Sequence, residues 1–388
     1  MELNMELRVC TKCVMPETHE TIMYDAKGVC NICHQHEYKH EKIDWPKKEA
    51  EFKEIVEKYR NKQTYDCIIP FSGGKDSVFV LYTMLKRYNV KPLVVSFDHG
   101  FYRPHHVQQR DRILRKLGVD FMLFRPNQQI VRKLTLESLI RKGDFCWHCH
   151  TGIFSYPMHI AVKFKIPLLV WGESTAEYTS YNDFDNIDER DETAFNKWIN
   201  LGITADDMVG MVSGGIEPRD LECYRYPKLR DLKAINYRSI CYGAYHEWDV
   251  RKHMEIISRE LGWEGDEVEG VPQQYNFTKV ECMMNGIRDY LKYIKRGYGR
   301  TSQLVTDDIR AGVLERDKAM AWVKQCDGKK PASLRVFLDF VGITEEEFNE
   351  IAVKHAVSPW TVDPQQLPEG KELYDQKDWD LSFGGKSL

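Results

Sequence analysis

The stretch PFSGGKDS, residues 70–77, decides the fold predicted for this chain. It follows the short apolar run YDCIIP at 65–70, and Val78, Leu81 and Leu85 come after it at helical spacing, so the pattern predicts a strand, a glycine turn and a helix. A turn that opens a helix directs its amide N–H groups and the helix dipole at an anion. A Walker loop would need more residues between its two glycines. The stretch therefore predicts a phosphate site of another kind.

The same alternation continues along the chain. Apolar runs at 92–98, 120–126 and 166–172 predict further strands, and the segments 103–117, 128–142 and 150–164 predict the helices between them. Strands separated by helices of this length predict an α/β fold with a doubly wound parallel sheet, whose ligand lies at the carboxyl ends of the strands.

The first 45 residues carry a different signal. Cys10-x-x-Cys13 and Cys30-x-x-Cys33, separated by sixteen residues, match the C-x2-C-x15–20-C-x2-C spacing of zinc sites. Four thiolates close a tetrahedron around Zn²⁺ and leave no position for water, so the pattern predicts a structural zinc ribbon. His34 lies nearby, and we expect it on the surface because the four sulfurs suffice.

The 388 residues allow two or three domains. We expect a zinc-ribbon segment at 1–45, the sheet domain at 46–215, and a mixed, then mainly helical region at 216–388 that contacts the substrate or a partner. The last region contains the capping box at Thr344–Glu347.

Charge and hydropathy exclude some classes of protein. The formal charge of −4, from 55 Lys+Arg and 59 Asp+Glu, argues against a protein that wraps nucleic acid. No apolar run approaches the length of a membrane span, and MELNMELRVC at the start has no secretory pattern. We therefore expect a cytoplasmic protein with no membrane partner.

Ser72-Gly73-Gly74-Lys75-Asp76-Ser77 resembles the S-G-G-x-D-S signature of the PP-loop ATP pyrophosphatases, whose domain is of the adenine nucleotide alpha hydrolase type. These enzymes cleave ATP between its α and β phosphates. The resemblance implies that ATP and Mg²⁺ are cofactors, with Asp76 as a candidate ligand of the ion. It implies nucleotide contacts at Ser72, Gly73, Gly74, Lys75, Asp76, Ser77, Phe97, Asp98, Gly172 and Glu173.

Further blocks are similar to one branch of this group, the N-acetyl sugar amidotransferases of lipopolysaccharide and O-antigen surface-polysaccharide biosynthesis. They are RVCTKCVMPET with GVCNICH near the start, CWHCHTG at 146–152, WGEST at 171–175 and KRGYGRTSQLVTDDIRAG at 295–312. The resemblance implies that the N-acetyl group of a nucleotide-activated sugar becomes an acetamidino group.

In the implied chemistry the amide oxygen attacks the α phosphorus of ATP, which gives an O-adenylyl imidate, and ammonia then displaces AMP. Lys75, Asp76 and Arg300 are the candidate catalytic residues, with Lys279 and Arg296 as further cations. The chain shows no glutaminase nucleophile, so a separate glutaminase is expected to supply ammonia, and the resemblance implies that the partners are glutaminase and cyclase-like subunits.

CWHCH at 146–150 leaves alternatives open. Its C-x-x-C is also found in PP-loop tRNA thiolases, where cysteines carry sulfur or an iron–sulfur cluster. Cys146 and Cys149 therefore fit a substrate pocket, a metal site, sulfur chemistry or core packing. A PP-loop tRNA thiolase is the alternative function.

Overall fold

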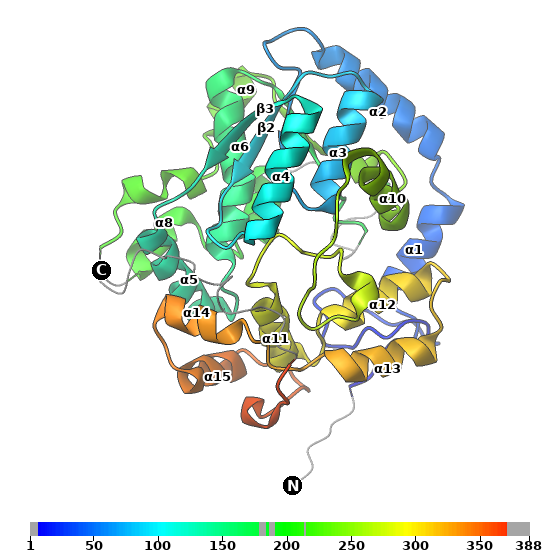
Figure 1. Ribbon diagram of the computed structural model, residues 1–388, viewed down its shortest axis with the longest axis vertical. Coiled ribbons are helices and arrows are strands. Elements are labelled where there is room, and N and C mark those ends of the chain that lie inside the picture. Colours follow the sequence, from blue (N-terminus) through cyan, green and yellow to red (C-terminus); the bar gives the residue numbers. More distant parts are fainter. Residues whose placement is uncertain (1–6, 178–183, 186–190, 213–214, 371–388) are drawn as a thin grey trace.

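The computed structural model describes residues 7–177, 184–185, 191–212 and 215–370, and a parallel sheet lies at its centre (Figure 1). Among these residues the sheet has five strands in the order β3-β2-β1-β4-β5, and all neighbours are parallel. The strands are β1 (Cys67–Pro70), β2 (Pro92–Phe97), β3 (Asp120–Phe124), β4 (Leu168–Trp171) and β5 (Arg238–Cys241). The predicted α/β class with a parallel sheet is confirmed.

Helices connect and cover the strands. They are α2 (Trp45–Tyr59), α3 (Lys75–Lys86), α4 (Pro104–Leu117), α5 (Gln128–Lys142), α6 (Trp147–Phe164), α7 (Glu192–Ala194), α8 (Ala205–Met211), α9 (Leu229–Ala234) and α10 (Val250–Leu261). Helix α6 packs on β1, β2 and β4, while α3 packs on β1 and is covered in turn by α10. One continuous apolar core joins these elements.

The strand order fixes where a ligand can bind. From β1 the chain moves outward through β2 to β3 and then returns to β4 on the other side of β1. The connections on the two sides of β1 therefore diverge above the carboxyl ends of β1 and β4, which is where open α/β sheets bind their ligands. The glycine turn after β1 and the Gly172 turn after β4 lie at this place.

Strand β5 was missed by the sequence analysis, which ended the sheet at the fourth strand. Four residues, Arg238 to Cys241, form this edge strand, with Val170 paired to Ile240. The stretch is too short and too close to basic residues to show a strand pattern. Because β5 pairs with β4, the sheet draws on the chain beyond residue 215.

The remaining elements flank the sheet domain. Near the amino terminus lies α1 (Asn31–Glu41), and the later helices are α11 (Asn285–Arg296), α12 (Arg300–Arg310), α13 (Arg316–Cys326), α14 (Leu334–Val341) and α15 (Glu345–Lys354). Figure 1 shows α12 and α13 beside the amino-terminal segment and α14 and α15 below α5. A second apolar cluster joins α5, α11, α14 and α15. None of the helices in the described ranges has the length and apolar character that a bilayer crossing requires.

Candidate functional site

The first glycine of the turn between β1 and α3, Gly73, cannot be replaced by a residue with a side chain. Gly73 has φ +84°, and a Cβ there would lie 2.9 Å from Nε2 of His106. Both the dihedral and the contact require glycine. The turn and helix therefore have the predicted strand–turn–helix geometry of a phosphate loop.

The two serines of this loop stabilise its curve. The Ser72 hydroxyl accepts a hydrogen bond from the Gly74 amide at 3.1 Å, and the Ser77 hydroxyl accepts one from the Gly73 amide at 3.1 Å. The Ser77 hydroxyl also donates to the Gly74 carbonyl at 3.1 Å. In this structure the serines thus bind the loop's own backbone.

Side chains from other elements hold the loop's carbonyl groups. Nε2 of His106, on α4, donates to the Ser72 carbonyl at 2.8 Å, and Nε1 of Trp263 donates to the Gly73 carbonyl at 3.2 Å. Both donors are buried. These two hydrogen bonds fix the direction of the loop's carbonyl groups, so the surrounding core helps to orient the loop.

Charged groups gather at the start of α3. Nζ of Lys75 lies 2.6 Å from Oδ2 of Asp76, while Oδ1 of Asp76 is buried and has no hydrogen-bond partner among the described residues. Burial lowers the pKa of Lys75, but the carboxylates of Asp76, Glu173 and Glu281 outweigh this, and the net shift is upward. Lys75 is therefore a cation, and the Asp76 oxygen is available to a ligand.

Glu281 was missed by the sequence analysis. Its Oε2 lies 3.2 Å from the position that a Cβ on Gly74 would take, so its carboxylate adjoins the phosphate loop. The segment around it pairs with residues after β2: the Arg103 amide donates to the Glu281 carbonyl at 3.2 Å, and the Met283 amide to the Phe101 carbonyl at 3.0 Å. No local pattern in the sequence marks this residue, because the long-range pairing alone brings it to the loop.

The turn after β4 lies beside the loop. A Cβ on Gly172 would lie 3.8 Å from Cβ of Asp76, and the Gly172 carbonyl accepts a hydrogen bond from the Gly243 amide at 3.0 Å. Glu173 follows and acts electrostatically on Lys75. The structure thus brings Gly172 and Glu173 to the phosphate loop, as the resemblance implied.

The loop's donor set fits a nucleotide phosphate with its hard cation. A helix amino terminus, a glycine turn and the partly buried ammonium of Lys75 are suited to phosphate oxygens, and the carboxylates of Asp76, Glu173 and Glu281 are the ligand type that Mg²⁺ takes. The partnerless Asp76 oxygen is the observation that favours an ion here.

Phe97 and Asp98, expected near adenine and ribose, have structural contacts. The Phe97 ring is buried among Phe124, Tyr156 and Tyr224. The Asp98 carboxylate accepts from the Gly100 amide at 2.8 Å and from Nε of Arg125 at 2.6 Å, and so shapes the turn after β2. No hydrogen bond or ion pair in the described ranges joins either side chain to the phosphate loop.

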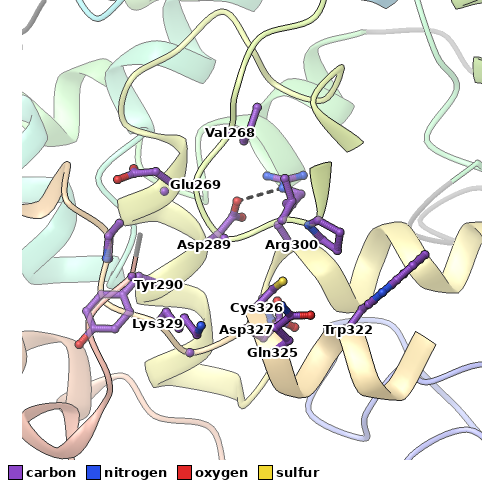
Figure 2. A pocket seen from close by; sticks show the side chains of 18 of the residues that line it. Val268, Glu269, Asp289, Tyr290, Arg300, Trp322, Gln325, Cys326, Asp327 and Lys329 are labelled. Atoms are coloured by element: carbon purple, nitrogen blue, oxygen red, sulfur yellow. Dashed lines mark hydrogen bonds and ion pairs between the residues drawn. The ribbon is translucent and has the colours of Figure 1, made fainter. Parts of the chain in front are cut away.

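Two of the expected cations of the carboxyl-terminal region, Arg296 and Arg300, lie elsewhere, which corrects that part of the prediction, whereas the charge of Lys279 acts on Glu281 beside the loop. Nε of Arg300 lies 3.0 Å from Oδ2 of Asp289, and both line a separate cavity (Figure 2). Nε of Arg296 lies 3.1 Å from Glu20 of the amino-terminal segment. Within the part of the chain that the structure describes, no hydrogen bond or ion pair joins either arginine to the loop. Spacing along the sequence could not show that α11 and α12 point these arginines away from it.

The amino-terminal cysteines form a metal-binding cluster that fits a zinc ribbon. The sulfurs of Cys10, Cys13, Cys30 and Cys33 lie within 4.8 Å of one another and are buried. Four sulfurs this close match the donor set of a closed tetrahedral site. His34 instead pairs with Asp25 at 3.0 Å on the surface, as expected.

The carboxyl-terminal region supports this cluster. Nε of Arg310, at the end of α12, lies 3.4 Å from the sulfur of Cys33. Nε of Arg316, at the start of α13, donates to the Cys13 carbonyl at 3.1 Å. The guanidinium charge of Arg310 offsets the negative charge of a four-thiolate site. The cluster therefore holds the amino-terminal segment against α12 and α13.

The CWHCH segment begins α6, and its two cysteines lie near a third. Burial is the main cause that raises the pKa of Cys146, Cys149 and Cys282, the last to about 12, and each thiol also responds to the charge of Arg288. Trp147 is buried and donates to the Ile203 carbonyl at 2.9 Å. Such thiols are protonated at neutral pH, which disfavours them as nucleophiles.

Comparisons with known proteins give one family match. Residues 269–380 match the family described as LPS biosynthesis protein WbpG-like, C-terminal domain. The matched region contains Glu281, Arg300 and most residues of the cavity that Arg300 lines. The match therefore covers the part of the chain that contributes a carboxylate to the phosphate loop.

Two individual proteins are similar. The uncharacterized protein MJ1599 of Methanocaldococcus jannaschii is 27% identical over 147 residues. The aligned residues cover 36% of this chain and 50% of the relative's length. The U34-tRNA thiolase NcsA from Methanococcus maripaludis, solved with its [4Fe-4S] cluster, aligns over 92% of both chains at 13% identity and a TM-score of 0.31. A TM-score this low supports no conclusion about the present chain.

The phosphate loop, the parallel sheet and the domain match agree with the resemblance found in the sequence. The residues that complete the loop come from the sheet domain and from the matched region together. Residues 269–380 therefore match the C-terminal domain of WbpG-like proteins of lipopolysaccharide biosynthesis.

Proposed function

We propose that this protein is an ATP-dependent amidotransferase that converts the N-acetyl group of a nucleotide-activated sugar to an acetamidino group. The observation that carries the proposal is the phosphate loop with a partly buried Lys75–Asp76 pair, completed by Glu281 from the region that matches a lipopolysaccharide biosynthesis domain. ATP chemistry at the loop and a sugar-related domain in one chain favour a reaction that activates a sugar substituent.

The reaction solves the problem that a neutral amide is a poor electrophile. The amide oxygen attacks the α phosphorus, the bond to pyrophosphate breaks, and an O-adenylyl imidate forms. Ammonia then adds to the imidate carbon, and AMP leaves with the former amide oxygen. The products are an acetamidino sugar, AMP and pyrophosphate.

The residues of the loop have distinct tasks in this reaction. Lys75 offsets negative charge that develops on the phosphates, and its raised pKa keeps it protonated. Asp76, Glu173 and Glu281 would hold Mg²⁺, which supplies charge neutralisation between the phosphates. Gly73 lets the backbone approach the phosphate oxygens, since no Cβ intervenes. Phosphoryl transfer of this kind depends on positioning and electrostatics more than on covalent catalysis by side chains.

Two further parts of the proposal concern the metal and the nitrogen source. We propose zinc as the ion of the four-cysteine cluster, because four buried sulfurs fit its tetrahedral structural sites. We propose that separate glutaminase and cyclase-like subunits supply the ammonia, as the family resemblance implies.

The proposal is tested by incubating the protein with ATP, Mg²⁺, ammonium and a panel of UDP- and CMP-linked acetamido sugars. Replacing the amide oxygen with NH lowers the mass of one panel member by about one dalton, and equal amounts of AMP and pyrophosphate appear. Mass spectrometry and nucleotide analysis detect both. Absence of a mass shift across the panel, together with sulfur incorporation into tRNA, would contradict the proposal.

A PP-loop tRNA thiolase is the second candidate, and the nearness of Cys146, Cys149 and Cys282 is the observation that favours it. Their raised pKa values oppose it, since sulfur transfer uses thiolates.

Cys149→Ser separates the two functions. We expect the variant to keep amidotransferase activity within about threefold of the wild type, because serine is nearly isosteric and the thiol takes no part in phosphoryl transfer. The measurement is the initial rate of AMP release with the active sugar nucleotide. Cys223→Ser, in another part of the core, is the matched control. A thiolase would instead lose its activity in Cys149→Ser and retain it in Cys223→Ser.

A further inference from the structure

A cavity of about 760 Å³ lies apart from the phosphate loop and is lined mostly by residues of the region matched by the family comparison (Figure 2). The segment 267–276, the starts of α11 and α12, and the segment 325–331 form its walls. This volume is in the range of sites that bind small molecules. Its lining indicates what kind of molecule fits.

Two carboxylates of the lining are already used by the fold. Asp327 accepts hydrogen bonds from the backbone amides of Gly299, Thr301 and Ser302 at 2.8, 3.0 and 3.1 Å, and thereby occupies the amino terminus of α12. Glu269 accepts from the Ser333 amide at 3.0 Å. The backbone amides at this helix terminus are therefore not free to bind a phosphate group, although helix amino termini commonly bind phosphate.

Asp289 and Arg300 retain hydrogen-bonding capacity toward the cavity. Oδ1 of Asp289 is buried and has no hydrogen-bond donor among the described residues, and it forms only a longer ion pair of 3.5 Å with Nζ of Lys292 there. The Asp289 side chain is only 8% exposed. Arg300 contacts Asp289 through Nε, and the described residues give its two terminal nitrogens no partner. A buried acceptor beside guanidinium donors suits a ligand hydroxyl, which both accepts and donates.

The rest of the lining is neutral and polar, with aromatic surfaces. Gln273, Gln274 and Gln325 offer amide groups that donate and accept, and Trp322 and Tyr290 offer flat rings. Four carboxylates against one arginine and one lysine give the lining a formal excess of negative charge. This excess repels phosphate, while Arg300 and Lys329 disfavour a cation. A neutral ring rich in hydroxyls satisfies all these groups.

A short segment of the chain runs from the phosphate loop to the wall of the cavity. Glu281 adjoins the loop, and Gly286 and Asp289, in the first two turns of α11, line the cavity. We propose that this cavity binds the glycosyl ring of the acceptor, with Asp289, Arg300 and Trp322 as its specificity-determining residues. The inference rests on the proposed function for the identity of the acceptor, and it adds where the acceptor is held.

The test uses the full chain and the panel of UDP- and CMP-linked acetamido sugars. Trp322→Ala is expected to raise the KM for the active sugar nucleotide about tenfold or more, because a stacking surface is lost, with kcat and the KM for ATP within about threefold of wild type. Trp322→Phe should restore most of the affinity. Lys324→Ala, exposed on the same helix α13 and outside the lining, is the matched control. Saturation-transfer NMR without ATP measures binding separately.

The outcomes distinguish the cavity from the reaction. Loss of the hexose signals in Trp322→Ala, with the signals present in wild type and Lys324→Ala, supports the inference even if no amidino product forms. An amidino product whose KM and NMR signals are unchanged in Trp322→Ala and in Asp289→Asn overturns the inference and leaves the proposed function standing. Failure of every panel member to bind the wild type also overturns it.

Discussion

Asp76→Asn is expected to lower the rate of AMP and pyrophosphate release by at least about a hundredfold. Asparagine keeps the size of the side chain and removes its charge. One oxygen of Asp76 lies 2.6 Å from Nζ of Lys75, and the other is buried without a hydrogen-bond partner among the described residues. Under the proposed function, the variant therefore removes a ligand oxygen for Mg²⁺ and the charge partner of Lys75 in a single change.

The control must separate lost chemistry from lost folding. Glu57→Gln removes a carboxylate that pairs with Arg60 on the surface at the end of α2. This residue has no part in the proposed reaction, so the variant should leave the rate unchanged. Thermal unfolding of both variants checks that the fold is retained. If Asp76→Asn keeps more than about a tenth of the wild-type rate with its fold intact, the assignment of Asp76 to the phosphate site is wrong.

Removal of the metal from the four-cysteine cluster is expected to release one zinc per chain and to lower the melting temperature by about 5 °C or more. In small zinc domains the ion contributes on the order of 10 kcal/mol to folding, and four buried thiols without an ion lose that contribution. Arg310 and Arg316 bind this segment to α12 and α13, so the loss extends to both helices.

Metal analysis and hydrogen exchange measure these effects. We expect a chelator, or Cys13→Ser, to raise exchange in residues 8–37 and 300–316, while exchange in β1, β2 and β4 stays slow because that core is independent of the cluster. Cys223→Ser, which belongs to another apolar cluster, is the control. Metal-free protein with wild-type stability would refute the structural role, and iron in place of zinc would refute the identity of the ion.

Much of the sheet domain followed from local pattern. The apolar run at 65–70 predicted β1, and the apolar residues at helical spacing after the glycine turn predicted α3, which begins at Lys75. Residues 128–142 form α5 as predicted. The apolar residues of these elements are numerous and regularly spaced, so their spacing in the sequence identifies the strand and the helices. The four residues of β5 are not, and only their pairing with β4 makes them a strand.

The candidate site was predictable where it is contiguous in the sequence. The loop residues and the turn at Gly172 could be found because strand ends of a parallel sheet meet at one edge. Glu281 could not, since it reaches the loop by pairing with the segment after β2. Arg300 was expected at the phosphates on the basis of its charge, but the orientation of α12 directs it to Asp289.

The position of Glu281 has a consequence for how such proteins diversify. The sheet domain provides the loop, but the segment that provides this last carboxylate also leads, within eight residues, to Asp289 at the wall of the cavity. An exchange of residues 269–380 between relatives would therefore replace most of this cavity together with Glu281 at the phosphate loop. Under the proposed function, a new acceptor specificity obtained in this way would come together with the carboxylate that lies beside the ATP site.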